Sequence, residues 1–579
     1  MRRVLPFSAS FFFRSLVSPG LAAMACLALA RAETQPENPG PVVRLPTFTV
    51  TETRILPPAE SWHYAQVPGF EILSDASDEV TEGLVHDFLL FQRAVETVWP
   101  TARMNADVAE SVILCGSASR FAEFVPANVI PVAENTLSLT LEDRENAAVV
   151  INLQNPGSMD STDMPDYSRR LLHDEYVHFV VGRIGPRTPP WLETALVKLF
   201  GAMVYDESKI GLPAIEDPDF AARKAYAAAV PAARGPAGAP VSSALAGDTA
   251  FEAAIAAGTF MPFERLFAAD SGPADPDSPR ARESYEFVHL CLFGAPAEYR
   301  LAFLNFAYHA AREPVTEPLF VRCFKKSYGD MLAILWGYTD YASDRVFKLQ
   351  EKDGRPLANI PPLALRKATD AESARVRGEA QRMAGRTDEA RRSLIAPYVR
   401  GSRDPQLLAA LGLAEHAAGR DERAEQFLEA AISARTSRAR AYVEYARILY
   451  LQALAKPAGT EGRLGVGQMA AILTPLFAAR SLRPPLPDAY ELIAEAWSHS
   501  SVEPTIGNLG AVDEGVVLFP YDMDLVYADA KLQARAGRKD TASALCDIGL
   551  EFAPDPGTRE RFRGLKDSLF PAAPNNPTQ

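Results

Sequence analysis

The sequence predicts an α+β domain followed by an all-α solenoid of helical hairpins. Short apolar runs such as Phe70–Ser74 and Ala147–Asn152 alternate with helical stretches in the first part, which indicates a small sheet with helices beside it. Beyond residue 369 the tripeptide Ala-Gly-Arg recurs within helical sequence, which is typical of a repeat protein. With 579 residues, 47% of them hydrophobic, the chain has enough material for several domains and their cores.

The first 32 residues have the features of a secretory signal peptide. Arg2 and Arg3 begin a basic segment, Leu21–Ala30 is an apolar run, and Ala30-Arg31-Ala32 is a typical cleavage site. The apolar run is too short to span a bilayer, and no later stretch is long and apolar enough. We therefore expect an exported protein, periplasmic or secreted, without a transmembrane segment. Cys26 lacks the leucine that usually precedes a lipidated cysteine, so we do not expect a lipoprotein.

The charge balance argues against nucleic-acid binding. The formal net charge is −14, and the signal region holds four of the 59 basic residues and none of the 73 acidic ones. Four cysteines lie outside that region without any metal-binding spacing: Cys115, Cys291, Cys323 and Cys546. We expect free thiols, with a single Cys291–Cys323 bridge as the alternative.

Composition divides the chain into consecutive segments. They are a signal peptide (1–32), an extended Pro-rich linker (33–58), an α+β domain (59–345), a charged linker (346–368), helical repeats (369–567) and a disordered tail (568–579). Within the α+β domain, residues 211–258 are rich in Ala, Pro and Gly and are expected to form a surface insertion. Residues 270–278 are expected to form a second exposed loop.

Leu171–Phe200 carries the densest group of residues suited to chemistry. It is predicted to form two helices joined by a Gly/Pro-rich turn, and the second helix opens at Pro189-Pro190-Trp191. The candidate residues are His173, Asp174, Glu175 and His178 on the first helix and Glu193 and Thr194 on the second.

A zinc peptidase of the His-Glu-x-x-His type needs two histidines four residues apart, a glutamate after the first, and a third ligand from the next helix. His178 can be the second histidine, and Glu175 stands where the general base belongs. The position four residues before His178 is Asp174. His173 is five residues away, about 140° around the helix, so only a π-bulge would bring the two rings together.

This stretch resembles the peptidase-MA-like gluzincin domains of bacterial envelope proteins, many of which carry tetratricopeptide repeats. Their pattern is His-Glu-Tyr-x-His, a short loop, then Pro-x-Trp-Leu-x-Glu-Gly-Leu-Ala-x-Tyr-Phe. The matching residues are Glu175, Tyr176, His178, Pro190, Trp191, Leu192, Leu196 and Phe200. The likeness covers roughly residues 59–345 and implies a gluzincin-like fold, in which a small sheet comes before a mostly helical half. The stretches that resemble the family's elements are the strand Phe70–Ser74 and the helix Val80–Val98, the strand Ser111–Cys115 and a helical stretch with Phe121 and Phe124, the strand Ala147–Asn152, and later helices at Phe260–Phe267 and Tyr285–Phe293. The sequence departs from the pattern where Asp174 replaces the first histidine, Thr194 the third-ligand glutamate, and Ala195 the glycine.

Three interpretations remain open at this stage. In the first, the domain is an inactive zinc-peptidase-like module without a cofactor, and the protein acts through binding. In the second, it is an active zinc metallopeptidase in which Asp174, His178 and Glu193 hold the metal and Glu175 is the catalytic base. In the third, both domains serve only as structural parts of an envelope assembly.

The second half of the chain carries a 34-residue period, which is the tetratricopeptide signature. Ala384-Gly-Arg386 recurs as Ala418-Gly-Arg420 and again as Ala536-Gly-Arg538. Ala439–Leu454 and Asp488–His499 are predicted first helices of further units, with partners distorted by insertions near 458–464 and 502–510. We expect four or five units that hold an extended peptide or partner protein, with a groove-free helical bundle as the alternative.

Other kinds of chemistry have little support in the sequence. There is no P-loop, no dinucleotide-type glycine cluster after a strand, and no G-x-S-x-G elbow. Six further histidines are scattered and are expected to be structural or exposed: His63, His86, His289, His309, His416 and His499.

Overall fold

The computed structural model describes residues 45–46, 61–67, 69–100, 109–126, 137–143, 146–154, 164–182, 184, 188–215, 261–268, 278–294, 298–343, 345–350, 360, 362–482, 485–520, 522–553 and 555–569. The predicted signal peptide lies outside these residues, as do nearly all of the 33–58 linker and of the 211–258 insertion. Almost all of the 270–278 loop and of the predicted tail lie outside them as well. The described residues fall within one compact unit.

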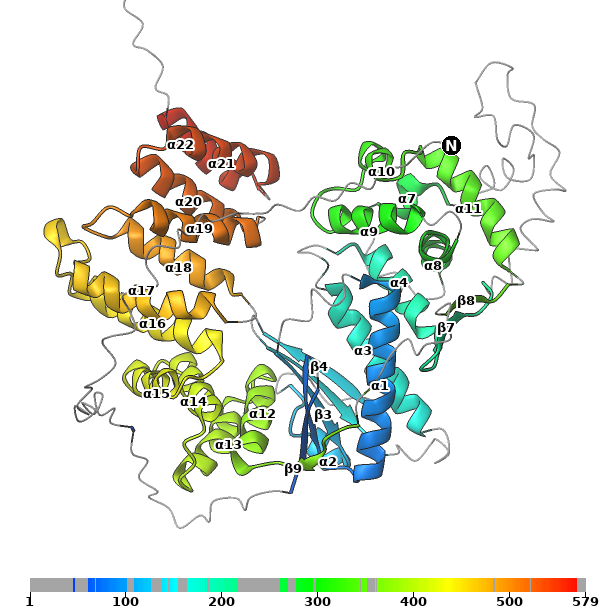
Figure 1. Cartoon of the computed structure of the whole chain (residues 1–579), viewed down its shortest axis with the longest axis horizontal. Helices are drawn as coiled ribbons and strands as arrows, with labels where there is room; N and C mark the ends of the chain where they lie inside the picture. Colours follow the sequence, from blue (N-terminus) through cyan, green and yellow to red (C-terminus); the bar gives the residue numbers. More distant parts are fainter. Residues whose placement is uncertain are drawn as a thin grey trace, which may run out of the picture. The chain divides into compact units, whose positions relative to one another are not determined.

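A mixed sheet forms the centre of the first half (Figure 1). Its strands, in spatial order, are β4 (Ser138–Glu142), β5 (Asn146–Asn152), β3 (Ala109–Cys115), β2 (Phe70–Ser74), β1 (His63–Val67) and β9 (Arg366–Lys367). Strands β2, β3 and β5 are parallel, and the strands flanking them are antiparallel to their neighbours. All seven residues of β5 are buried, as expected for a strand covered on both faces. The three predicted strands are thus confirmed.

Two helices cover one face of the sheet, α1 (Asp78–Val98) and α3 (Met164–Gly182). Ser77 caps α1 by accepting the backbone N–H of Val80, and the helix buries an apolar stripe against the sheet. Alternate strand residues such as Val112 and Val149 pack into this core. The sheet therefore provides the floor on which the motif helix α3 lies.

The rest of the first half is helical, as predicted. It consists of α4 (Pro190–Gly201), α7 (Phe263–Leu266), α8 (Pro279–Phe293), α9 (Glu298–Ala310), α10 (Glu317–Phe324) and α11 (Tyr328–Ala342), with a small sheet of β6 (Val204–Tyr205), β7 (Lys209–Leu212) and β8 (Phe347–Gln350). Aromatic rings of these helices pack together around Trp191, which is 1% exposed and contacts Phe267, Phe287 and Phe306. Trp191 is a packing anchor for α4.

The first repeat helix, α12 (Asp370–Met383), covers the second face of the sheet. Its Val376 and Ala380 share a core with Ile113 and Val150 of the strands. Strand β9 pairs with β1 just before this helix begins. The stretch 346–368, which the sequence predicts to be a linker, thus contributes strands β8 and β9 within its described residues.

Five helical hairpins and a final helix make up the described second half. The pairs are α12 with α13 (Thr387–Val399), α14 (Pro405–Ala417) with α15 (Asp421–Ser433), α16 (Ala439–Ala455) with α17 (Val466–Arg480), α18 (Pro487–Ser498) with α19 (Ile506–Leu518), and α20 (Met523–Arg535) with α21 (Lys539–Phe552). Helix α22 (Pro556–Leu569) packs on the last pair. The insertion predicted near 458–464 contains the 3-10 turn Thr460–Gly462 and precedes α17, while residues 506–510 of the second predicted insertion form the first turns of α19.

The Ala-Gly-Arg tripeptide is the turn between the two helices of a hairpin. Gly385 has φ +73°, and Arg386 donates its N–H to the carbonyl of Gln381 at 2.8 Å, which closes a Schellman motif. Gly419 and Gly537 have matching positive φ values. The tripeptide is therefore repeated because each turn needs a left-handed backbone conformation that only glycine adopts without strain.

Two further structural predictions can be checked. Cys115, Cys291, Cys323 and Cys546 are all free thiols, so the alternative Cys291–Cys323 bridge is wrong. Among the described residues, none of the helices combines the length and apolar character needed to cross a bilayer.

Candidate functional site

The motif helix α3 is a regular α-helix without a π-bulge, so His173 and His178 diverge. His173 faces α1, where its Nε2 lies 2.9 Å from Asp87 Oδ2 and its ring stacks on Phe91 at 3.9 Å between centroids. Tyr205 also donates its hydroxyl to Asp87 at 3.2 Å. Burial favours the neutral form of the Asp87 carboxyl. The hydrogen bond and the charge of His173 outweigh this effect and hold the pKa of Asp87 below its usual value. His173 thus helps fix α3 against α1.

Glu175, the predicted catalytic base, faces the edge strand β4. Its carboxylate accepts hydrogen bonds from the hydroxyl of Ser138, at 3.0 Å, and from that of Thr140. Both carboxylate oxygens therefore have hydrogen-bond donors on the strand. This arrangement ties α3 to the sheet edge.

His178 lies on the other side of the helix and pairs with Glu193 of α4. His178 Nδ1 is 2.9 Å from Glu193 Oε1, and the two side chains are 49% and 40% exposed. The hydrogen bond to Glu193 raises the pKa of His178 against the opposing effect of burial, and the same bond lowers the pKa of Glu193. An ion pair this exposed contributes little to stability.

Asp174 and Thr194 complete the predicted set. Burial raises the pKa of Asp174, while the nearby histidines His178 and His173 oppose that rise. Asp174 Oδ1 faces Gly201 at the end of α4. A Cβ atom placed on Gly201 would lie 3.8 Å from this oxygen. Thr194 is half-buried beside Glu193 on α4.

We tested whether these residues fit a zinc ion. A zinc peptidase site needs three protein donors around one open position. His178 Nδ1 is engaged with Glu193, Asp174 faces Gly201, and Glu175 is held by β4. Across the described ranges, no three His, Cys, Asp or Glu side chains are grouped so that they could hold a metal ion. The donor set as placed does not fit zinc.

The residues that match the peptidase-MA-like pattern are mostly core residues. Tyr176, Trp191, Leu192, Leu196 and Phe200 are all at most 2% exposed. The resemblance therefore depends chiefly on packing positions, which can persist when ligand positions change.

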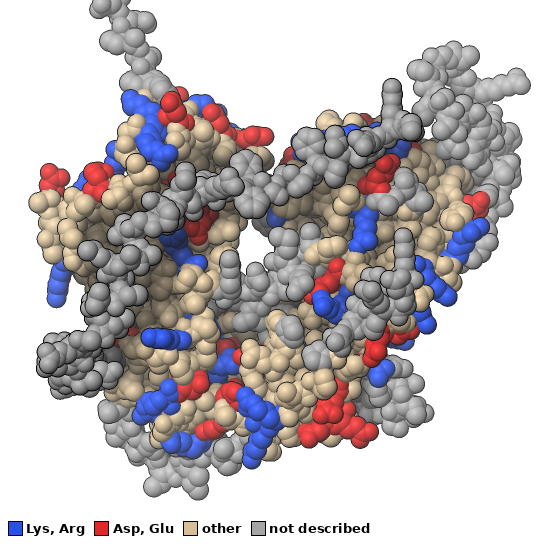
Figure 2. All heavy atoms as spheres, viewed as in Figure 1, with Lys and Arg blue, Asp and Glu red and all other residues tan. Residues whose placement is uncertain are grey.

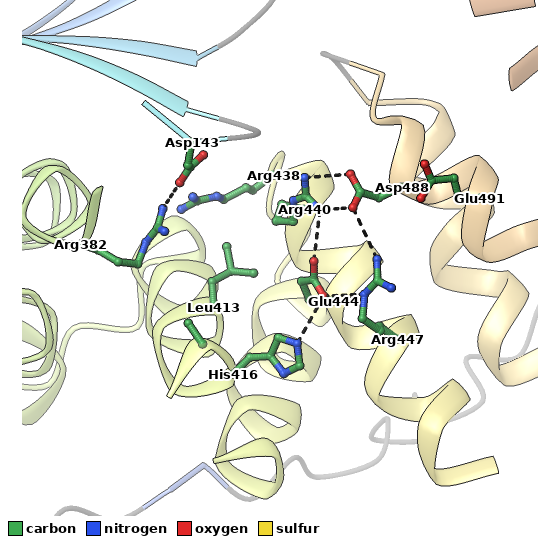
Figure 3. A pocket seen from close by; sticks show the side chains of 11 residues that line it. Asp143, Arg382, Leu413, His416, Arg438, Arg440, Glu444, Arg447, Asp488 and Glu491 are labelled. Carbon is green, nitrogen blue, oxygen red and sulfur yellow. Dashed lines mark hydrogen bonds and ion pairs between the residues drawn. The ribbon is translucent and has the colours of Figure 1, made fainter. Parts of the chain in front are cut away.

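A second candidate site lies on the first helices of the repeats (Figure 3). It is a pocket of about 470 Å³ that faces Asp143, at the end of β4. Its walls are Asp143, Arg382, Leu413, His416, Ala417, Arg438, Arg440, Glu444, Arg447, Asp488 and Glu491. Apart from Asp143 and Arg438, the N-cap residue of α16, the side chains come from α12, α14, α16 and α18, four consecutive first helices.

An ion-pair network forms one wall of this pocket. Arg440 of α16 contacts Asp488 of α18 at 3.0 Å and Glu444 of its own helix at 3.2 Å. Arg447 contacts Glu444 at 3.0 Å and Asp488 at 3.5 Å. Figure 3 shows these side chains directed toward one another between neighbouring helices. The network links the third and fourth repeats and gives their shared face fixed charges.

His416 also lines this pocket. The sequence analysis expected it to be structural or exposed and did not place it in a site. Its Nδ1 is 2.7 Å from Asp421 and its Nε2 is 3.4 Å from Glu444. The hydrogen bonds to Glu444 and Asp421 raise the pKa of His416 despite its partial burial. Burial opposes ionisation of Glu444, yet His416 and the two arginines lower its pKa to about 2.

The 34-residue period could have found these positions. Arg382 and His416 are 34 residues apart, as are Leu413 and Arg447, and all four line the pocket. Equivalent positions on successive first helices face the same side of a repeat array. This spacing would have grouped these four residues, but not the remaining charged residues of the pocket, such as Arg440, Glu444 and Asp488.

Comparisons with known proteins add little to this picture. No family model matches the chain, and no curated protein matches it. Among solved structures, a MamA RS-1 ArsTM double mutant is similar at 17% identity and a TM-score of 0.23, covering 35% of this chain and 99% of its own. A thermophilic TPR protein of Thermus thermophilus is similar at 18% identity and a TM-score of 0.24, covering 34% of this chain and 98% of its own.

These scores are too low to define a fold, but the chain's own features do so. Five successive helix pairs, the Ala-Gly-Arg turns and the close approach of paired helices are those of tetratricopeptide repeats. The second half is therefore a solenoid of helical hairpins with tetratricopeptide-like spacing.

Basic and acidic side chains intermix on the face that Figure 2 presents, without one broad basic area.

Proposed function

We propose that this is an exported protein that binds an extended peptide of a partner through its repeats. The observation that carries the proposal is the pocket built by four consecutive first helices, because such a face presents charges along the path of an extended chain. Export is inferred from the signal-like residues 1–32.

We further propose that the first domain is peptidase-MA-like in architecture and no longer performs zinc chemistry. A motif helix on a sheet, an edge strand beside it and a following helix with Glu193 support the gluzincin-like assignment. Asp174 and Thr194 stand at ligand positions, and the other motif residues contact neighbouring elements of the fold. The domain would then serve as a platform for the repeats.

One observation favours the alternative, an active zinc metallopeptidase. Glu193 reaches His178 although it is one residue away from the expected ligand position. A metal ion between these two groups, with Asp174 as a third ligand and Glu175 as base, would restore a hydrolytic site. Metal analysis of the purified full chain separates the two proposals. About one zinc per chain, removed by His178→Ala, would support the alternative.

A display selection tests the binding proposal directly. Full-length protein is used to select peptides from a random library, and the selected peptides are then measured against two variants. Arg447→Ala removes a pocket charge, while Arg392→Ala removes an exposed arginine of α13 outside the pocket. We expect weaker binding only for Arg447→Ala. Equal affinity for both variants, or no selected peptide, would refute the proposal.

A further inference from the structure

Two residues that precede the sheet in sequence, Leu45 and Pro46, lie on the repeats. They belong to no helix or strand, and Leu45 is half-buried while Pro46 is buried. Leu45 packs against an apolar core formed mainly by the first two hairpins. The hydroxyl of Tyr398 on α13 donates a hydrogen bond to the carbonyl of Pro46 at 2.8 Å, across 352 residues of sequence. Part of the predicted 33–58 linker thus contacts the repeats.

Contacts within the repeats fix the orientation of the Tyr398 ring. Tyr398 is 5% exposed and packs edge-to-face with Phe427 of α15, at 5.2 Å between ring centroids. The guanidinium of Arg403 lies over the same ring, 4.2 Å from its centroid, and donates to the carbonyl of Tyr398. Burial raises the pKa of Tyr398, although Arg403 and Arg423 oppose the rise, so the hydroxyl keeps its proton and stays a donor. We call Tyr398, Phe427 and Arg403 the tyrosine site.

The pair of residues at this site has the chemistry of a peptide ligand. A proline restricts the residue before it to extended conformations, which directs the Leu45 side chain and the Pro46 carbonyl without help from secondary structure. Aromatic surfaces of several recognition domains bind extended proline-containing segments in this way. The tyrosine site contacts one backbone carbonyl, and the core beside it takes one apolar side chain. An extended segment from another protein can present the same two features.

We propose that the tyrosine site is a second peptide site of the repeats, which binds an extended Leu-Pro segment and holds Leu45 and Pro46 as its ligand in cis. The site is separate from the charged pocket, because Tyr398 and Phe427 belong to second helices and none of its three residues lines that pocket. The inference therefore goes beyond peptide binding in the pocket. Because the ligand is part of the chain, its effective concentration is high, and a partner with the same pair must compete with it.

Proteolysis of the wild-type chain provides the first test. Trypsin cuts after Arg44, directly before the bound pair, and this cut requires the segment to leave the site. Tyr398→Phe removes only the hydroxyl, so cleavage at this bond, followed by mass spectrometry, should be about fivefold faster. Tyr341→Phe, at a tyrosine of α11 that is 51% exposed, is the matched control and should leave the rate unchanged. Equal rates for Tyr398→Phe and wild type would overturn the proposal.

Binding in trans provides the second test. Leu45→Asp places a charge against the apolar core and should empty the site. A labelled peptide with the sequence of residues 40–51 should then bind the full-length variant at least tenfold more tightly than wild type, in which the chain's own segment competes. Adding Tyr398→Phe to the variant should weaken this binding about fivefold. Adding Arg447→Ala, which changes the pocket, should leave it unchanged.

Several results would overturn the inference. Failure of the peptide to bind the Leu45→Asp variant, or binding that Tyr398→Phe leaves unchanged, would show that the site does not recognise the segment. Equal binding of a peptide with alanine in place of both the leucine and the proline would show that another feature is recognised. If Leu45→Asp unfolds the repeats, as judged by circular dichroism, the segment is part of their core and not a ligand. Loss of binding with Arg447→Ala would place the peptide in the pocket, which refutes this inference and leaves the proposed function in place.

Discussion

The two halves of the chain use charged side chains in opposite ways. In the first half, His173, Glu175 and His178 of one helix each contact a different neighbouring element, so their polar atoms hold α3 in place. In the repeats, Arg440 and Asp488 join neighbouring first helices and still line an open pocket. The first half carries the residues that look chemical in sequence, and the second half carries the cavity. The difference shows that residue types alone do not locate a site, because the space between helices decides what can bind.

The halves also differ in how they are assembled. The sheet joins strands just over 300 residues apart, since β1 pairs with its neighbour in sequence, β2, and also with β9, where His63 faces Lys367. The repeats are built from neighbours in sequence, each pair packing on the next. Substitutions at contacts between the two halves should therefore lower the free energy of unfolding the most.

The largest expected effect comes from removing Arg375, which joins the halves. Its guanidinium donates to both carboxylate oxygens of Glu71 at 2.8 and 2.7 Å, and its side chain is only 11% exposed. Arg375→Ala should cost about 2–4 kcal/mol, because it leaves Glu71 without its main partner in a partly buried place. Denaturant unfolding gives the free energy. Arg392→Ala, which removes an arginine that is 69% exposed, is the control and should cost less than about 0.5 kcal/mol. Similar losses for the two would contradict the idea of a specific joint.

The next effect tests the close packing of the repeats. A Cβ at Gly515 of α19 would lie 2.6 Å from Cβ and Cγ of Tyr490, atoms near the backbone that cannot swing away. Gly515→Ala should therefore destabilise the protein by about 1–3 kcal/mol. Gly510→Ala in the same helix meets no atom within 4 Å and should stabilise it by about 0.5–1 kcal/mol. The melting temperature of each variant gives the test, and an unchanged or raised melting temperature for Gly515→Ala would show that the helices are not so closely packed.

A buried acid in the repeats should give the third effect. Asp529 is fully buried, and burial together with the charge of Asp513 raises its pKa to about 7. The folded state then keeps a proton that the unfolded chain releases, so wild-type stability falls as pH rises from about 4 toward 7. Asp529→Asn removes this dependence. The free energy of unfolding of the variant, relative to that of wild type, should rise by roughly 1–3 kcal/mol from pH 5 to pH 8, as measured by denaturant unfolding. A constant difference over this range would contradict the raised pKa of Asp529.

The smallest effect is expected at the motif itself. His178→Ala removes one member of a half-exposed ion pair and should cost at most about 0.5 kcal/mol at neutral pH. The pair contributes only while His178 is charged, so its effect should vanish as pH rises through the raised pKa of His178. Added zinc should leave the melting temperature of both proteins unchanged. A zinc-dependent rise in wild type that His178→Ala abolishes would show a metal site.

Much of the fold could be predicted from local patterns. The strands Phe70–Ser74, Ser111–Cys115 and Ala147–Asn152 are apolar runs that end in turns, and the structure contains each. The 34-residue spacing of Ala-Gly-Arg indicated the repeats because one backbone turn recurs there. Helices α16 and α18 were likewise predicted.

Strands β4 and β9 could not be predicted, for physical reasons. Ser138–Glu142 alternates polar and apolar residues at a sheet edge, and β9 is a two-residue strand fixed by pairing with a distant partner. The pocket was missed because its charges are brought together by stacking of repeats, which no single helix reveals. At the motif, the sequence named the residues but could not show that their polar atoms already have partners.

The central claim is that this protein binds peptides and does not cut them. The most direct measurement is mass spectrometry of a pocket-selected peptide after incubation with the full-length protein and added zinc. We predict that the peptide is recovered intact, with and without a chelator. Cleavage that a chelator stops and that Glu175→Gln abolishes would contradict the account.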